Sequence, residues 1–334
     1  MGKFKINDLS PVVIIAELAC EHGGKMDAAK RLIKAAKEAG ADIAKLQVHV
    51  IKEEMVPDTI KFWAGSMDEV LDKVNIGTAR EHKELKKYCE EIGIMYLCTP
   101  FCREAADILE EVGVDAYKTG SGELTNIPMQ RHIAKKGKPM IVSTGMSTLE
   151  DIAETVKALN EEGASFALTH CISEYPADYG DLNLGMINVL KEKFGVVVGY
   201  SDHTNEIYSA IAAVAKGAKI IEKHLTIRDL HGPDNNVSLD PEQFKQMVEA
   251  IRKVEQSLGS IKQIHDQEKE VSGWAHHSVV VKADIPAGTK ITDKMLTVKR
   301  PGWGVPAKFL PDFIGKVAKK DLKVNELIKL KDVE

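Results

Sequence analysis

The feature that most constrains the fold is the alternation of short apolar segments with amphipathic helical segments over the first 260 residues. The apolar segments are rich in β-branched residues and are apolar on both faces, which is typical of parallel strands covered by helices. Eight strand–helix units in about 250 residues are the pattern of a (β/α)8 barrel, or TIM barrel. We therefore predict an α/β barrel with strands at residues 12–18, 43–48, 95–99, 116–119, 140–143, 166–170, 196–201 and 220–226.

A doubly wound open sheet is the main alternative to a barrel. Such a sheet usually has a Gly-rich phosphate turn after its first strand. Here that segment reads ELACEHGG, and neither GxGxxG nor GxxxxGK occurs in the chain. The segment 50–77, which carries Phe62 and Trp63, is too long for an ordinary strand-to-helix connection. On a barrel it would lie at the C-terminal face, either as a lid or as a surface excursion with a small core of its own.

The periodicity changes after Gly259, which indicates a domain boundary. We predict a barrel domain at residues 1–260, a polar linker at 261–277 and a small β-rich domain at 278–334. A domain of that size is too small to contain an active site of its own and is expected to lean on the barrel or on a partner.

The small domain contains an internal repeat. Residues 284–291 read DIPAGTKI, and residues 321–328 read DLKVNELI with the same spacing of Asp, aliphatic and turn positions. Gly288 and Asn325 occupy matching places, and both residue types suit turns with positive φ.

The composition argues against several classes of protein. The formal net charge is -5, from 45 Lys and Arg against 50 Asp and Glu, whereas a nucleic-acid-binding chain would carry a concentrated basic surface. The longest apolar runs fall far short of the roughly 20 residues that span a bilayer. The opening MGKFKINDLS lacks the apolar run of a signal peptide, and the five cysteines show neither disulfide-framework nor zinc spacing. We expect a cytoplasmic protein with free thiols that binds neither nucleic acid nor membrane.

Polar and ionisable residues end or follow nearly every predicted strand. The C-terminal ends of barrel strands converge on one mouth, where barrel enzymes have their active sites. Buried charges are costly to desolvate, so stability alone does not account for such residues on all eight strands. We predict an active site built from Glu17, His22, Lys45, Gln47, Thr99, Lys118, Ser121, Ser143, Thr144, His170, Ser201, Asp202, His203, Glu222, Lys223 and His224.

These residue types allow anion binding and proton transfer. Lys45, Lys118 and the hydroxyl groups are donors for an anion such as a phosphate with a carboxylate. Glu17 and Glu222 have acid–base capacity.

The two histidines of the last two predicted strands leave two interpretations open. His203 and His224 could share a divalent metal ion. They could equally be two hydrogen-bonded side chains, because the chain contains neither an HxxxH nor an HExxH motif.

Several segments occur in a characteristic order along almost the whole chain, namely IIAELACEHGG, GADIAKLQ, YKTGSGE, PMIVSTGM, HCISEYP, GYSDHT, IEKHLT followed by GPD, and VKRPGWG. Together they resemble the sialic acid synthase family, the phosphoenolpyruvate-dependent synthases of N-acetylneuraminate and related nonulosonates. The C-terminal domain resembles type III antifreeze protein, a β-clip fold known as the SAF domain. The combination of KTGSGE, STGM and SDHT is specific, whereas any one of them alone is not.

The resemblance implies a transferase, similar to N-acetylneuraminate synthase, that joins phosphoenolpyruvate to the open-chain aldehyde of an N-acylated hexosamine of the N-acetylmannosamine type. It implies a divalent metal ion, Mn2+ or Mg2+, on His203 and His224. It also implies a domain-swapped homodimer in which Arg300 reaches the sugar in the neighbouring barrel. The residues implied to bind phosphoenolpyruvate are Lys45, Thr99, Lys118, Ser121, Ser143 and Ser201. Those implied to face the sugar are Glu17, Gln47, Tyr175 and Asp234, with Glu222 beside the reacting carbons.

The chain departs from the family pattern mainly on the sugar side. Glu21 precedes His22 where the family has Asn, and Ser173 and the pair Asn235-Asn236 also differ. The sugar therefore stays open between N-acetylmannosamine, its 6-phosphate, and a 2,4-diacetamido-6-deoxy sugar leading to legionaminate or pseudaminate. A Schiff-base aldolase that uses a buried lysine is the rival activity.

Overall fold

The computed structural model describes residues 6–7, 9–57, 59–62, 65–230 and 232–334. Trp63, named above as part of the segment 50–77, lies outside the described residues. The chain forms two compact units, Met1–Gly259 and Ser260–Glu334. Among the helices within those ranges, none combines the length and the apolar character needed to cross a membrane.

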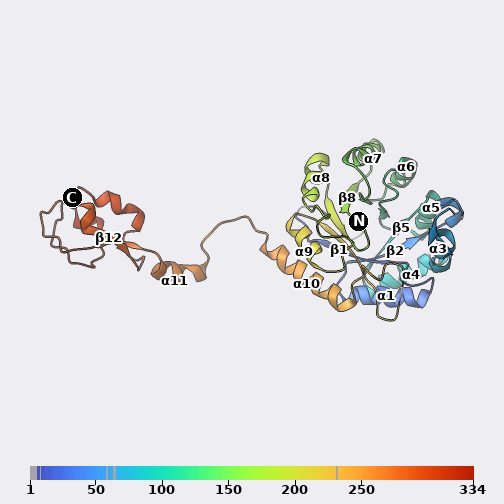
Figure 1. Cartoon of the computed structure of the whole chain (residues 1–334), viewed down its shortest axis with the longest axis horizontal. Helices are drawn as coiled ribbons and strands as arrows, with labels where there is room; N and C mark the ends of the chain where they lie inside the picture. Colours follow the sequence, from blue (N-terminus) through green and yellow to red (C-terminus); the bar gives the residue numbers. More distant parts are fainter. Residues whose placement is uncertain (1–5, 8, 58, 63–64, 231) are drawn as a thin grey trace. The chain divides into compact units, whose positions relative to one another are not determined.

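The first unit is a barrel of parallel strands. The hydrogen-bonded order is β5-β2-β1-β10-β9-β8-β7-β6, and β5 and β6 at its two ends lie against each other. The order follows the chain around a closed ring, as a TIM barrel requires (Figure 1). The strands are β1 (Val13–Ala19), β2 (Ile43–Val48), β5 (Met95–Pro100), β6 (Tyr117–Thr119), β7 (Met140–Ser143), β8 (Phe166–Cys171), β9 (Val198–Asp202) and β10 (Ile220–His224). The predicted barrel is confirmed, with strand ends that differ from the prediction by a few residues.

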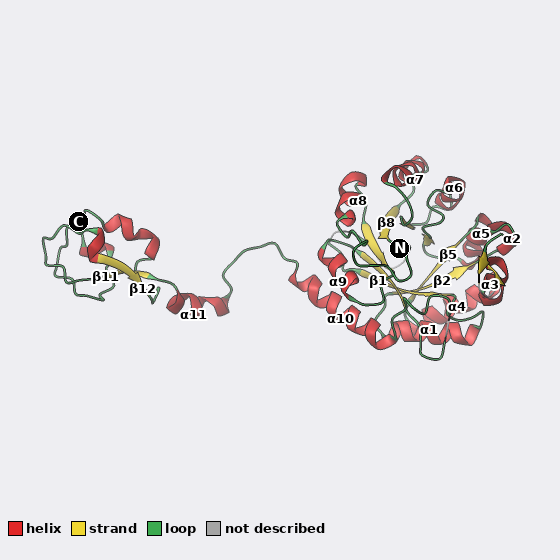
Figure 2. Cartoon of the chain, in the orientation of Figure 1, coloured by secondary structure: helices red, strands yellow, loops and turns green. Residues whose placement is uncertain are grey.

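Helices surround the ring of strands (Figure 2). They are amphipathic, and their apolar faces pack on the outward side chains of the strands. Helix α4 shows how the sequence delimits them: Thr78 and Glu81 form a capping box at its start, and Gly93 ends it with φ 76°. The helices are α1 (Met26–Glu38), α4 (Ala79–Ile92), α5 (Arg103–Val112), α6 (Ile127–Ala134), α7 (Leu149–Glu161), α8 (Met186–Phe194), α9 (Tyr208–Ala215) and α10 (Pro241–Ser257).

The inward side chains of the strands change character along the barrel axis. Towards the N-terminal ends they are apolar and form a closed cluster, which includes Val13, Ile15, Ile43, Leu97, Ala116, Ile141, Ala167 and Ile220. Because side chains alternate along a strand, the next inward positions are two residues further on. In this chain those positions are Glu17 after Ile15 and Glu222 after Ile220, so the polar residues lie above an apolar plug.

The segment 50–77 forms a small excursion between β2 and α4. Asn75 ties its two ends together, because its side chain accepts from the backbone N–H of His49 at 3.2 Å and donates to the carbonyl of His49 at 2.8 Å. The excursion contains α2 (Ile51–Glu54), β3 (Lys61–Phe62), β4 (Gly65–Ser66) and α3 (Met67–Val74).

The second unit has a separate apolar core that includes Ile285, Leu322 and Phe313. The repeat seen in its sequence is a structural repeat: Gly288 and Asn325 have φ values of 81° and 68°. Asp321 accepts from the N–H of Ala287 at 2.8 Å, and Asp284 accepts from the N–H of Val324 at 2.9 Å, so each half caps the other's turn. Its elements are β11 (Ser278–Val281), β12 (Leu296–Lys299) and the 3-10 helices η1 (Asp293–Met295), η2 (Ala307–Phe313) and η3 (Leu330–Asp332).

A helix, α11 (Asp266–Ala275), occupies much of the segment predicted as a linker. Its last turn packs against the turn that follows β12, where the N–H of Gly302 donates to the carbonyl of Gly273 at 2.8 Å. The guanidinium of Arg300 lies 5.7 Å from the ring centroid of Trp274. Helix α11 therefore packs on the rest of the second unit and contacts Arg300, which was predicted to bind the sugar.

Candidate active site

A cavity of about 300 Å³ opens at the C-terminal ends of the barrel strands. It is the place at which the inward polar positions of all eight strands and their following loops meet. The predicted site residues that line it are Glu17, Lys45, Gln47, Thr99, Lys118, Ser121, Ser143, Tyr175, Ser201, His203, Glu222, His224 and Asp234.

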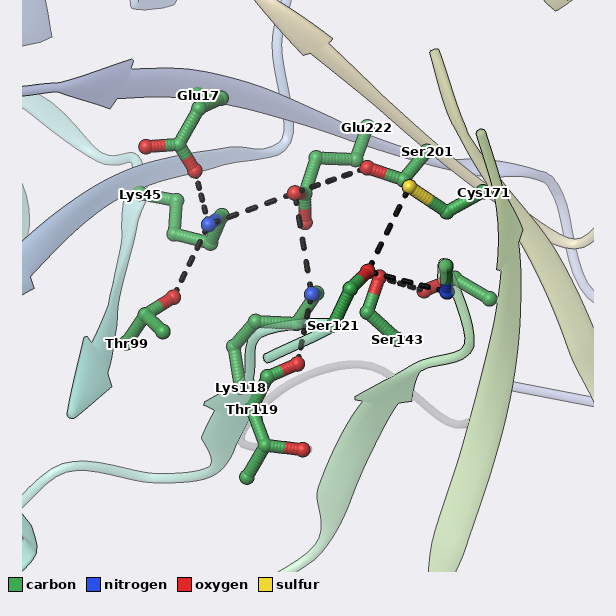
Figure 3. A network of polar contacts seen from close by, with 12 residues as sticks. Glu17, Lys45, Thr99, Lys118, Thr119, Ser121, Ser143, Cys171, Ser201 and Glu222 are labelled. Carbon is green, nitrogen blue, oxygen red and sulfur yellow. Dashed lines mark hydrogen bonds and ion pairs between the residues drawn. The ribbon is translucent and has the colours of Figure 1, made fainter. Parts of the chain in front are cut away.

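The floor of the cavity is an ion-pair network around Lys45. Strand register places Lys45 on β2 beside Glu17 on β1, and the two side chains form an ion pair. The ammonium of Lys45 also lies 3.4 Å from Oε1 of Glu222 and donates to Oγ1 of Thr99 at 3.0 Å. Figure 3 shows Lys45 between the two carboxylates, with Lys118 on the other side of Glu222. All of these side chains are almost completely buried.

The two lysines of the floor have different electrostatic environments. Burial lowers the pKa of Lys45, but the carboxylates of Glu17 and Glu222 outweigh it and raise the pKa above the ordinary value. The ammonium of Lys118 is 3.9 Å from Glu222 and donates to the carbonyl of Thr119 at 3.0 Å, and burial lowers its pKa. An anion bound next to Lys118 would stabilise the ammonium form of that lysine and so oppose the effect of burial on its pKa.

The two buried carboxylic acids of the floor have pKa values shifted in opposite directions. Burial raises the pKa of Glu17 to about 7, against the attraction of Lys45. Burial also opposes ionisation of Glu222, but Lys118 and Lys45 lower its pKa below the ordinary value. Near neutral pH, Glu222 is therefore a carboxylate and Glu17 exchanges a proton. Such a split between neighbouring acids is a usual basis for assigning acid and base roles.

Hydroxyl groups line the side of the cavity next to Lys118. The Oγ of Ser121 accepts from the N–H of Gly145 at 3.1 Å, and the Oγ of Ser201 donates to Oε1 of Glu222 at 3.2 Å. Oγ of Ser143 accepts from Thr169 at 3.2 Å. Together with the lysines, these hydroxyls form a set of donors suited to an anion with several oxygens.

His203 and His224 lie on neighbouring strand ends with ring centroids 5.4 Å apart. Nδ1 of His203 donates to the carbonyl of Ile172 at 2.7 Å, so Nε2 carries the lone pair of the neutral ring and accepts from the hydroxyl of Tyr175 at 3.1 Å. Nδ1 of His224 is buried without a hydrogen-bond partner among the residues that the structure describes, 3.7 Å from Oδ2 of Asp234. Burial and the adjacent His203 hold the pKa of His224 well below its ordinary value, so the ring is neutral. Within the part of the chain that the structure describes, no group of three or more His, Cys, Asp or Glu residues has metal-binding geometry.

The loop after β10 brings Asp234 to the cavity, and Glu21 holds that loop. Oε1 of Glu21 accepts from the N–H of Asp234 at 3.0 Å, and Oε2 accepts from the N–H of Gly232 at 3.0 Å and the hydroxyl of Thr226 at 3.1 Å. Burial and the adjacent Glu21 raise the pKa of Asp234 to about 6.

The geometry agrees with comparisons to known proteins. The NeuB family model matches residues 32–263, and the SAF domain model matches residues 276–334. The chain belongs to the NeuB family. The suspected sialic acid synthase relationship and the C-terminal SAF domain are thus confirmed.

Relatives of this NeuB-family chain include named synthases. It is 37% identical to the N,N'-diacetyllegionaminic acid synthase of Campylobacter jejuni, over 96% of this chain and 100% of that protein. It is 36% identical to the N-acetylneuraminate-9-phosphate synthase of Mus musculus, over 94% of this chain and 89% of that protein. Among solved structures, the N-acetylneuraminic acid synthetase of Leptospira borgpetersenii in complex with citrate matches with a TM-score of 0.73 and 32% identity, over 81% of this chain and 93% of that one.

Sequence reasoning missed four side chains that line the cavity of this NeuB-family barrel, Phe101, Glu123, Met146 and Cys171, and named Ser173, which also lines it, only as a departure from the family pattern. Oε2 of Glu123 is buried with no hydrogen-bond partner in the described part of the chain, and burial together with Glu54 raises the pKa of Glu123 to about 7. Its signal was present in the sequence, since the segment KTGSGE runs from β6 directly to Glu123. Sequence reasoning used this segment for the resemblance and assigned Glu123 no role.

Some residues expected at the mouth do not line the cavity. Lys223 and Asp202 form an ion pair at 3.1 Å, with both side chains fully buried, because strand alternation turns them towards the helices. Nε2 of His170 donates to the carbonyl of Leu182 at 2.7 Å, and His22 and Thr144 likewise fall outside the lining. The expectation that every polar strand end faces the mouth was therefore wrong for these positions.

Arg300 belongs to the second unit, where its side chain is exposed. It is absent from the residues that line the barrel cavity within the described ranges. Its predicted role at a neighbouring barrel stays a prediction.

Proposed function

We propose that this chain is a phosphoenolpyruvate-dependent nonulosonate synthase, which joins phosphoenolpyruvate to the aldehyde of an N-acylated amino sugar and releases phosphate. The observation that carries the proposal is the cavity floor, where Lys45 and Lys118 flank Glu222 and Glu17 has a pKa of about 7. The names of its relatives, synthases of legionaminic acid and N-acetylneuraminate 9-phosphate, support the same reaction class.

The chemistry matches the residues of the floor. Lys45, Lys118 and the nearby hydroxyls bind the carboxylate and phosphate of phosphoenolpyruvate and orient its C3 carbon towards the aldehyde. Attack by C3 forms the new C–C bond and leaves positive character at C2, and the aldehyde oxygen takes a proton. Water adds to C2, and the C–O bond to phosphate then breaks to give the 2-keto acid. The protonated Glu17 is suited to supply the proton to the aldehyde oxygen, and the carboxylate of Glu222 is suited to accept one from water.

We also propose that His203 and His224 hold a divalent metal ion, Mn2+ or Mg2+. Both rings fit this role: the Nδ1–H of His203 is anchored on a backbone carbonyl, as is usual for a metal-binding histidine, and Nδ1 of His224 is buried with no hydrogen-bond partner within the described ranges. Tyr175 and Asp234 lie beside the two rings. When bound there, the ion would act as a Lewis acid on the aldehyde oxygen.

Analysis of the reaction products tests this proposal. Incubation with phosphoenolpyruvate and a panel of N-acylated hexosamines should yield a nine-carbon or related 2-keto acid by mass spectrometry. Phosphate release should depend on the sugar, and 18O placed in the bridging oxygen of phosphoenolpyruvate should appear in the released phosphate. Retention of that label in the sugar product would contradict the C–O cleavage proposed here.

A Schiff-base aldolase is the second candidate, and the lowered pKa of Lys118 is the observation in its favour. The ion pairs of both lysines with Glu222 favour the synthase instead, because they keep the lysines as cations for an anionic substrate. Borohydride reduction in the presence of pyruvate distinguishes the two activities. We expect no covalent lysine adduct; a stoichiometric adduct would establish the aldolase.

The quaternary structure and cellular location belong to the proposal as well. We propose a homodimer with swapped domains, in which Arg300 contributes to the sugar site of the partner, and a location in the cytoplasm. The exposed guanidinium of Arg300, lying over Trp274 beside a rigid turn, is compatible with a contact outside its own unit.

A further inference from the structure

The cavity has a cationic floor and an anionic rim. The floor contains both lysines that line the cavity, Lys45 and Lys118, and each of them faces Glu222 within 4 Å. The rim contains the carboxylates of Glu123 and Asp234, and Asp234 has a side chain that is 24% exposed. Among the described residues that line the cavity, the rim therefore has two carboxyl groups and neither a lysine nor an arginine.

Further carboxylates stand behind the two rim residues. Glu54 faces Glu123, where it helps burial to raise the pKa of Glu123 to about 7, and it is itself paired with His49 at 2.9 Å. Glu21 lies behind Asp234 and accepts from its backbone N–H at 3.0 Å. The carboxylates behind the rim, Glu54 and Glu21, thus have the same sign of charge as the two rim carboxylates.

The remaining rim surface is apolar or neutral. Phe101 lines the cavity and stacks on His49 with ring centroids 4.3 Å apart, and Met146 lines it with 73% of its surface exposed. Tyr175 completes this side with 45% exposure. Carboxylates accept hydrogen bonds from hydroxyl and amide N–H groups, and apolar side chains accommodate acyl methyl groups.

From this charge distribution we infer that the amino-sugar substrate is neutral and unphosphorylated. The inference rests on the proposed function, because phosphoenolpyruvate would occupy the floor and take up both lysines. A second phosphate, on the sugar, would face Glu123 and Asp234 with no lysine or arginine left for it among the described lining residues. The divalent ion proposed for His203 and His224 would be engaged by the aldehyde oxygen at the other end of the sugar. Like charges in a partly buried site repel strongly, since the effective dielectric constant there is well below that of water. The guanidinium of Arg300, if a second copy of the chain brought it to the rim, would neutralise the charge of one carboxylate. The other carboxylate would still repel the phosphate.

The test compares sugars under one set of conditions. We expect kcat/KM for N-acetylmannosamine or for 2,4-diacetamido-2,4,6-trideoxymannose to exceed that for N-acetylmannosamine 6-phosphate by about 100-fold, at saturating phosphoenolpyruvate and pH 8. A sugar phosphate that is used equally well or better would overturn the inference while leaving the synthase reaction intact. Failure of every sugar to release phosphate from phosphoenolpyruvate would instead overturn the proposed function, and the inference with it.

A charge-neutralising variant tests the physical cause. Glu123→Gln keeps the size of the side chain and removes one rim charge, so the preference for the neutral sugar should narrow by about tenfold. Glu53→Gln, at an exposed position on α2, makes the same charge change outside the cavity and should leave the preference as it is. A preference that is the same in the Glu123→Gln and Glu53→Gln variants would contradict the anionic rim as the source of selectivity. Thermal unfolding of both variants verifies that they are folded.

Discussion

At the scale of single residues, burial and neighbouring charges give similar side chains different pKa values. Glu17 and Glu222 are the same residue type on adjacent strands, and both are buried. Two lysines stabilise the ionised form of Glu222, whereas burial dominates at Glu17. The proposed roles of acid and base rest on this difference rather than on residue identity.

The first prediction concerns the pH profile. Because the pKa of Glu17 is raised to about 7, the fraction that can donate a proton falls as the pH rises through that value. The rate constant kcat should therefore have a descending limb near pH 7, and Glu17→Gln, which cannot ionise, should lower kcat and remove that limb. A descending limb that is unchanged in Glu17→Gln would reassign the proton donor.

The second prediction concerns the anion-binding lysine. Lys118→Met removes the charge and keeps most of the volume of the side chain, so it should raise KM for phosphoenolpyruvate by about 10–100-fold, the usual range for a lost charge-assisted hydrogen bond. KM for the sugar should change much less. Lys253→Met, at an exposed position on α10, is the matched control. Equal increases for both substrates would contradict the assignment of Lys118 to phosphoenolpyruvate.

The third prediction concerns the metal site. Chelation should abolish turnover, and Mn2+ or Mg2+ should restore it. His203→Ala should weaken Mn2+ binding, measured by electron paramagnetic resonance or calorimetry, by at least about 10-fold. His132→Ala, which removes a partly exposed histidine paired with Asp107, is the control. Full activity in excess chelator would exclude the metal.

At the scale of elements, the barrel mouth is assembled by contacts between loops that follow distant strands. Glu21 follows β1, and its carboxylate accepts three hydrogen bonds from the segment after β10 that carries Asp234. The same segment contacts the loop after β8, because Asn236 donates to the carbonyl of Tyr175 at 2.9 Å. The sugar-side residues are thus positioned by loop–loop hydrogen bonds, whereas the lysines and Glu222 are positioned by strand register.

The fourth prediction follows from that difference. Glu21→Gln replaces one carboxylate oxygen with an amide that cannot accept, which disrupts at least one bond to Gly232 or Asp234. KM for the sugar should rise by about tenfold while KM for phosphoenolpyruvate stays within about twofold. Glu249→Gln, exposed on α10, should change neither. A loss confined to kcat, with both KM values unchanged, would argue against a positioning role for Glu21.

At the scale of the whole molecule, the second unit contributes a defined surface rather than a flexible tail. Helix α11 packs on the turn after β12, and Ser278 holds the other side of that turn by donating to the carbonyl of Pro301 at 2.6 Å. Arg300 is therefore presented from a rigid support and stacks on the Trp274 ring. This organisation is suited to delivering a guanidinium to a partner's sugar site.

The fifth prediction tests that arrangement by complementation. Arg300→Ala and His203→Ala homodimers should each be nearly inactive, because each lacks one contribution to every site. A heterodimer formed by dissociating and mixing the two variants should contain one intact site and recover up to half of the wild-type activity per dimer. Heterodimers that form, as shown by native mass spectrometry, yet recover no activity would exclude an arginine shared across the interface.

Local pattern alone determined the elements of this protein. The run 43–48, for example, is apolar on the outward face and changes from apolar to polar on the inward face, and this pattern suits a barrel strand with an active-site end. The internal repeat of the second unit was also predicted from the sequence, since Gly288 and Asn325 were expected in positive-φ turns and are found there. Such features depend on residues close together in the chain, so the sequence displays them directly.

Only the tertiary structure decided which polar residues share the cavity and in what ionisation state. Lys223 and His224 are neighbours in the chain, yet alternation turns Lys223 towards Asp202 outside the ring and His224 into the cavity. The position of Glu123 in KTGSGE was visible in the sequence, but its burial and its raised pKa beside Glu54 were not. The unequal pKa values of Glu17 and Glu222 depend on the distances to Lys45 and Lys118, residues on other strands. Burial and charge are sums over neighbours in space, and closure of the barrel selects those neighbours.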